Sequence, residues 1–120
     1  MKQYWTKRIK AFGYAFRGLA DLLRTQAHAQ IHLLAIVCVG AAGWYYQLDK
    51  TEWLAVMLAM ALVLALEALN TAVEYLTDLV SPDYHPLAGK AKDVAAAAVL
   101  IAAIGAVLVG GMVFLPRILG

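Results

Sequence analysis

Residues 94–115 read VAAAAVLIAAIGAVLVGGMVFL, a run of twenty-two residues without a charge or a proline. A helix of this length rises about 33 Å, close to the thickness of the hydrocarbon core of a bilayer. Two further apolar runs, residues 29–48 and 53–76, are of similar length. The chain is 63% hydrophobic and only 15% charged, whereas soluble domains are about half apolar and about a quarter charged. The sequence therefore predicts an all-α integral membrane protein with three transmembrane helices, in one domain that covers residues 1–120.

Residues 1–27 are predicted to form an amphipathic helix on the membrane surface. Their large apolar side chains recur every three or four positions and so share one face, with most basic residues elsewhere: Trp5, Ile9, Phe12, Phe16, Leu19 and Leu23. Basic residues opposite an aromatic and aliphatic face favour a helix that lies in the membrane interface. The alternative is an ordinary amphipathic helix that packs on protein.

Lysine and arginine are distributed unequally around the predicted spans. Eight of the ten lie in the N-terminal segment and the loop 77–92, whereas only Lys50 and Arg117 lie on the other side. Because positive residues accumulate in cytoplasmic loops, we expect the N-terminus and the loop 77–92 to be cytoplasmic. No basic stripe carries interleaved aromatic residues, so nucleic-acid binding is not expected.

The second span carries polar side chains that lipid disfavours. Glu67, Asn70, Thr71, Glu74 and Asp78 are spaced so that they share one face of a helix, which we call the polar stripe. Ionisable residues within a span usually face protein and mark function. Carboxylate oxygens suit magnesium. The stripe therefore predicts a functional site toward the cytoplasmic end of this span, unless Glu67 and Glu74 merely pair with lysines and hold an oligomer together.

The segment before the third span adds further groups. Lys90 and Lys92 are cations of the kind that binds phosphate. Asp93 is suited to cap the third span, and Gly89 gives the loop backbone conformational freedom. The three prolines lie outside the predicted spans, at Pro82, Pro86 and Pro116. From these residues alone we predict a membrane enzyme or an ion-coupled carrier that acts near the cytoplasmic face. No GxxxxGK[ST] motif is present, so this pattern does not call for ATP.

Small residues recur every four positions in the third span, at Ala98, Ala102, Ala106 and Gly110. Such a ridge lets helix backbones approach closely in lipid. Three helices alone make a thin bundle, and we therefore expect a homo-oligomer.

The pattern ExxNTAxE at residues 67–74 resembles the prokaryotic diacylglycerol kinase family, which consists of small three-span lipid kinases. The resemblance continues through Tyr84-His85-Pro86 and through Gly89-Lys-Ala-Lys92-Asp93, and it covers essentially the whole chain. The loop 81–87 and the C-terminal end are more similar to the undecaprenol kinase branch than to the diacylglycerol branch.

This resemblance implies phosphorylation of a lipid alcohol with ATP and Mg²⁺, in a homotrimer of the bacterial inner membrane with active sites at subunit interfaces. It implies that Glu67 is the general base and that Glu74 holds the metal. Asn70 would orient Glu67 or a nucleotide phosphate, and Lys92 would bind the phosphates of ATP. The other nucleotide-binding positions that it implies are Lys10, Tyr14, Asp78, Asp83, His85, Gly89 and Asp93.

One position departs from the family pattern. The family usually has a second metal-binding glutamate in a pattern like ExNxxIH, whereas residues 26–32 read QAHAQIH. Gln26 takes the glutamate position and His28 the asparagine position. An amide oxygen can bind magnesium but brings no negative charge, so we expect weaker metal binding unless His28 or a nearby carboxylate compensates.

The sequence leaves the acceptor lipid open. Undecaprenol or a similar polyprenol is the expected substrate, and diacylglycerol is the alternative. Two other classes also stay open: a non-catalytic family member, which Gln26 makes conceivable, and a small proton-coupled exporter that uses an intramembrane glutamate. Such an exporter normally has four spans and a carboxylate near mid-membrane.

Overall fold

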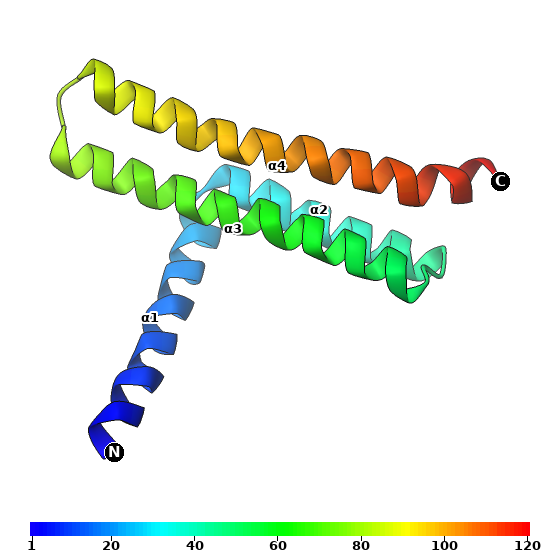
Figure 1. Cartoon of the computed structure of the whole chain (residues 1–120), viewed down its shortest axis with the longest axis horizontal. Coiled ribbons are helices and arrows are strands. Elements are labelled where there is room, and N and C mark those ends of the chain that lie inside the picture. Colours follow the sequence, from blue (N-terminus) through cyan, green and yellow to red (C-terminus); the bar gives the residue numbers. More distant parts are fainter.

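A computed structural model describes all 120 residues, which form four helices (Figure 1). They are α1 (Lys2–Thr25), α2 (Ala27–Tyr45), α3 (Lys50–Val80) and α4 (Pro86–Leu119). α3 and α4 form a long antiparallel hairpin, and α2 packs against α3. The backbones of α2 and α4 lie farther from each other than from α3, so α3 is the centre of the bundle. α2, α3 and α4 are each long and apolar enough to cross a membrane, which confirms the prediction of three spans.

α1 projects sideways from the bundle (Figure 1) and contacts only α2 and α3. The chain turns at Gln26, whose backbone is extended and separates α1 from α2. The tyrosine hydroxyl of Tyr75 on α3 donates to the carboxylate of Asp21 at 2.8 Å and ties α1 to the bundle. Most of the apolar face of α1 is exposed, including Trp5 and Phe12. No protein within the chain covers this face, as expected of a helix whose apolar side meets lipid.

The turn between α2 and α3 is short and well capped. Gln47 takes a positive φ of 51°, which tightens the turn. The side chain of Asp49 accepts from the backbone N–H of Glu52 at 2.8 Å, and Glu52 accepts in return from the N–H of Asp49 at 3.2 Å. This reciprocal capping box fixes the first turn of α3. Arg117 of α4 donates to both carboxylate oxygens of Glu52 and, at 2.7 Å, to the carbonyl of Tyr46. The arginine thereby joins the end of α4 to the α2–α3 turn.

The second and third predicted spans are shorter than the helices that contain them. α3 continues to Val80 and α4 begins at Pro86, so the connecting loop is residues 81–85 rather than 77–92. Hydropathy is expected to fall where a span leaves lipid, but the backbone hydrogen bonds of a helix continue beyond that point. The apolar runs therefore marked the apolar middle of α3 and α4 and not their ends. Conversely, α2 ends at Tyr45, three residues before the predicted end, because the turn begins there.

The cap of α4 also differs from the prediction. His85 occupies the cap, and its Nδ1 accepts from the N–H of Leu87 at 3.1 Å. Pro86 follows in the first turn, where a missing N–H costs nothing. Asp93, the predicted cap, lies inside the helix and is exposed. Pro116, predicted to lie beyond the helix, lies in its last turns. A proline there removes one backbone N–H and so leaves one helical carbonyl without its usual donor.

The ridge of small residues faces the interior of the chain. Ala102 is buried, and Ala106 and Gly110 are half-buried. Only Ala102 of the ridge is buried where α4 packs against α3, whereas an added Cβ at Gly110 would meet nothing within 4 Å.

Candidate active site

One face of α3 changes from apolar to polar at Glu67. Toward the α2–α3 turn this face carries Val56, Met60 and Val63, and toward the α3–α4 loop it carries the polar stripe. The spacings of three and four residues keep all these side chains on one line along the helix. The site therefore lies where an apolar surface and a polar surface meet on a single continuous helix.

Glu67 is the most deeply buried member of the polar stripe, with 3% of the residue exposed. Its Oε2 lies 3.7 Å from Nε2 of His32 on α2. His32 is partly exposed, so the pair sits at the edge of the bundle rather than in a closed core. His32 was not among the predicted site residues. The signal that marks it is its position as the last polar residue before the apolar run of α2.

Asn70 and Thr71 follow Glu67 and leave two polar atoms without partners. The amide nitrogen of Asn70 donates to Oε1 of Glu74 at 3.3 Å. The other amide atom, Oδ1 of Asn70, is buried and makes no hydrogen bond, and the same holds for the hydroxyl of Thr71. Buried polar atoms are nearly always satisfied in folded proteins. These two atoms therefore mark places where a further group is able to bind.

A polar pocket of about 280 Å³ lies beyond the stripe, at the α3–α4 loop. Five of the residues that the resemblance assigns to nucleotide binding line it: Asp78, Asp83, His85, Gly89 and Lys92. Nζ of Lys92 donates to Oδ1 of Asp78 at 2.5 Å. The loop is held by Ser81, whose hydroxyl donates to the carbonyl of Asp83 at 2.8 Å. The pocket has few apolar walls and carries the carboxylates of Asp78 and Asp83 beside the ammonium group of Lys92, so it suits a polar ligand.

Other predicted residues do not join this pocket in a single chain. Lys10 and Tyr14 lie on α1, which does not contact α4. Both are exposed, and Tyr14 stacks with Arg17, whose guanidinium carbon is 5.6 Å from the ring centre. The side-chain amide of Gln26 donates to the hydroxyl of Thr25 at 3.2 Å and not to the stripe. Asp93 is exposed outside the pocket.

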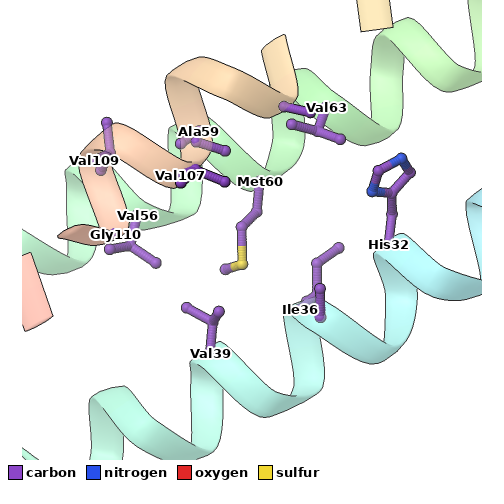
Figure 2. Close-up of a pocket in the computed structure, with 13 residues that line it drawn as sticks. His32, Ile36, Val39, Val56, Ala59, Met60, Val63, Val107, Val109 and Gly110 are labelled. Atoms are coloured by element: carbon purple, nitrogen blue, oxygen red, sulfur yellow. The ribbon is translucent and has the colours of Figure 1, made fainter. Parts of the chain in front are cut away.

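The apolar half of the same face of α3 forms the floor of a groove (Figure 2). α2 and α4 form its walls, and eleven of the thirteen lining residues are hydrophobic, so the groove offers little to a polar ligand. His32 lies at one end, beside Val63, whereas Val39 and Gly110 lie toward the other.

Together the groove, the buried carboxylate and the polar pocket place an apolar surface and a polar surface along one face of α3. Comparison with known proteins gives the family. The family model for prokaryotic diacylglycerol kinase matches residues 13–114. The chain therefore belongs to the prokaryotic diacylglycerol kinase family and is a bacterial membrane lipid kinase.

The individual relatives are named either undecaprenol kinase or diacylglycerol kinase. Undecaprenol kinase of Bacillus subtilis is 38% identical over 110 residues, which are 92% of this chain and 89% of that protein. A diacylglycerol kinase of Synechocystis is 44% identical over 112 residues, 92% of this chain and 64% of that protein. The diacylglycerol kinase of Escherichia coli K12 is 37% identical over 105 residues, 87% of this chain and 85% of that protein. These matches confirm the predicted lipid kinase and give no support to the exporter alternative.

Proposed function

We propose that this protein transfers the terminal phosphoryl group of ATP to the hydroxyl of undecaprenol or a similar polyprenol, at the cytoplasmic face of the inner membrane. The observation that carries the proposal is the position of Glu67, a buried carboxylate at the point where the apolar groove meets the polar stripe. A lipid hydroxyl reaches this depth from the bilayer. A nucleotide reaches it from the polar pocket at the loop.

Glu67 would act as the general base. It would take the proton of the lipid hydroxyl while the hydroxyl oxygen forms a new bond to phosphorus and the bond between phosphorus and ADP breaks. Phosphoryl transfer depends mainly on position and charge neutralisation. Lys92 would neutralise phosphate charge, and Asp78 would hold its ammonium in place through their hydrogen bond. The other pocket residues would contact the nucleotide, together with Lys10, Tyr14 and Asp93.

The residues present fit a magnesium ion. Glu74 offers a carboxylate, and Asn70 offers an amide oxygen that is buried and has no other partner. Magnesium usually takes one or two carboxylates together with substrate phosphates. No group of three His, Cys, Asp or Glu side chains is assembled in the chain, so phosphate oxygens and water would complete the shell. The ion would supply positive charge to the phosphates. Gln26 replaces the family carboxylate and would weaken this site.

The proposal includes a homotrimer with each site shared between subunits. Lys10 and Tyr14 are separated from the loop pocket within one chain, so a neighbouring subunit would have to bring them together. α3 also carries exposed small residues at Ala61, Ala65, Ala68 and Ala72, of which Ala68 and Ala72 lie beside α1. Small residues at this spacing favour close helix contacts in lipid. The proposal also places the N-terminus in the cytoplasm, because most lysines and arginines lie in the N-terminal segment and in residues 77–92.

Diacylglycerol is the second candidate acceptor, because the Synechocystis and Escherichia coli relatives bear that name. The test is transfer from labelled ATP in mixed micelles with magnesium, offered undecaprenol and diacylglycerol in parallel, with Glu67→Gln as control. Labelled undecaprenol that disappears in the control is the expected result. Preference for diacylglycerol would overturn the choice of substrate. ATP binding without transfer to either lipid would indicate a non-catalytic member.

A further inference from the structure

The joint between α1 and the bundle is confined to the last turns of α1. Residues 2–19 are all exposed, and Leu22 is the one buried residue of this helix. The side-chain amide of Gln30 on α2 donates to the carbonyls of Leu23 and Arg24 at 3.1 and 3.3 Å. These contacts fix the place where α1 ends, but they lie at the joint itself and leave the direction of the helix to other contacts.

A cavity of about 390 Å³ lies between α1 and α3 beside this joint. Most of its walls are small or apolar side chains, from Ala15 to Leu22 on α1 and from Ala68 to Tyr75 on α3. The hydroxyl of Thr71 in its wall is buried and has no hydrogen-bond partner. In a well-packed interface, interdigitating side chains would fill such a space. Packing therefore contributes little to holding α1 at its observed angle.

One directed contact bridges the two walls of this cavity. The hydroxyl of Tyr75 on α3 donates to Oδ2 of Asp21 on α1 at 2.8 Å, and it is the only side-chain hydrogen bond between these two helices. A hydrogen bond has a preferred distance and direction, and one with a charged acceptor is stronger than one between neutral groups. This pair therefore sets the angle between α1 and α3 where the loose packing does not.

A small change of this angle becomes large at the residues that α1 carries. Tyr14 and Lys10 lie seven and eleven residues before Asp21, which is about 10 Å and about 16 Å along the helix axis. A tilt of about 10° at Asp21 would displace Lys10 by about 3 Å. Displacements of this size are costly for groups that must meet a substrate. The position of Lys10 thus depends on a contact near the opposite end of its helix.

We propose that Asp21 and Tyr75 are positioning residues for the nucleotide. Their hydrogen bond holds α1 at the angle at which Lys10 and Tyr14 reach ATP in the pocket of a neighbouring subunit. The inference rests on the proposed function, which assigns Lys10 and Tyr14 to the nucleotide. Loss of the bond should weaken ATP binding, whereas the lipid hydroxyl and Glu67 keep their arrangement, because α1 does not hold them in place.

The first test separates KM from kcat. Tyr75→Phe removes the hydroxyl and keeps the ring, and we expect KM for ATP to rise about fivefold, the scale of one lost hydrogen bond. The values of kcat and of KM for undecaprenol should stay unchanged. Asp21→Ala should give the same rise, and the double variant should be no worse than either single one, because both changes remove one interaction.

Conservative and distant changes provide the controls. Asp21→Asn keeps an acceptor for the tyrosine hydroxyl and should keep the KM of the parent. Tyr45→Phe, at the exposed far end of α2, removes the same hydroxyl from another tyrosine and should change nothing. A fall in kcat with KM for ATP intact would overturn the proposal. Additive losses in the double variant would also overturn it.

A distance measurement tests the same pair without ATP or lipid substrate. Spin labels at Gln3→Cys on α1 and Leu79→Cys on α3, both exposed positions, are introduced together with Cys38→Ala. Labelled chains are diluted into unlabelled ones, so that each oligomer carries one pair of labels. Double electron–electron resonance should give one narrow distance distribution in the parent and in Asp21→Asn, and a shifted or broader one in Tyr75→Phe.

The two measurements fail in different ways. A distance distribution that Tyr75→Phe leaves unchanged would overturn the positioning role. A parent that transfers no phosphoryl group, while this distance still depends on Tyr75, would refute the proposed function and not the control of α1 by the hydrogen bond.

Discussion

His32 on α2 and Glu67 on α3 face each other with Nε2 and Oε2 3.7 Å apart, and this is the only polar contact between these two helices. The remaining packing between α2 and α3 is apolar. The two groups are close but not hydrogen-bonded, and we propose that His32 positions the carboxylate that we propose as the general base.

Replacement of His32 should slow the chemical step. His32→Ala removes the partner that orients Glu67, and we expect kcat to fall roughly tenfold, because small displacements of reacting groups are costly. KM for ATP should stay the same, since the nucleotide pocket lies at the other end of the stripe. His32→Gln, which keeps a donor, should recover much of kcat, and Cys38→Ala on the exposed side of α2 serves as control. A loss through KM for ATP alone, with kcat intact, would contradict a positioning role.

Glu67→Gln should abolish transfer and preserve ATP binding. General bases typically contribute about 10²- to 10⁴-fold, and we expect a loss of at least about 10²-fold in kcat. Glutamine is nearly the same size and neutral, so the buried position should tolerate it. Nucleotide affinity, measured by equilibrium dialysis, should match that of the parent. If the variant kept more than a tenth of the activity, Glu67 would not be the base.

Lys92 and Lys90 should differ in their effects. Lys92 lines the polar pocket and donates to Asp78, whereas Lys90 is exposed and lies outside it. Lys92→Gln should raise KM for ATP by roughly tenfold or more, the scale of a lost charge-assisted hydrogen bond. Lys90→Gln removes the same charge two residues away and should leave KM for ATP unchanged. Similar KM values in the two variants would mean that only net charge matters.

Gln26→Glu should strengthen magnesium binding. The change restores the carboxylate of the family pattern, and we expect the magnesium concentration for half-maximal rate to fall roughly tenfold, a scale typical of groups around a metal. Gln3→Glu adds the same charge at the exposed start of α1, away from the stripe, and should have little effect. Rates recorded as a function of magnesium at saturating ATP check this. A magnesium dependence equal to that of the parent would remove position 26 from the metal site.

Arg117→Ala should destabilise the fold without a direct effect on catalysis. The substitution removes the arginine donors from Glu52, which keeps only the N–H of Asp49, and from the carbonyl of Tyr46, which is unfavourable for partly buried acceptors. We expect a lower midpoint of thermal unfolding in detergent, with kcat unchanged at temperatures well below it. Lys50→Ala, at an exposed position near the same turn, is the control. An unchanged midpoint would show that the arginine contacts contribute nothing to stability.

The spans and the polar stripe were predictable because both depend on local periodicity. Apolar runs and spacings of three or four residues are properties of single helices. The helix ends were not predictable from hydropathy, since Asp93 and Pro116 lie in helix that extends beyond the apolar run. His32 was missed because its partner Glu67 lies on another helix, and no spacing within α2 encodes that contact. The roles of Lys10 and Tyr14 remain predictions, because one chain does not bring them to the pocket.

The unbroken course of α3 from Val56 through Glu67 to Asp78 has a mechanical consequence. The places that we propose for the lipid and the nucleotide lie on one continuous helix, so the distance between them is set by the helical rise and their mutual direction by the helical twist. The enzyme needs no domain closure to bring its two substrates into line. The cost is intolerance of length changes: one residue inserted between Glu67 and Asp78 would turn the base by about 100° away from the phosphate-binding end.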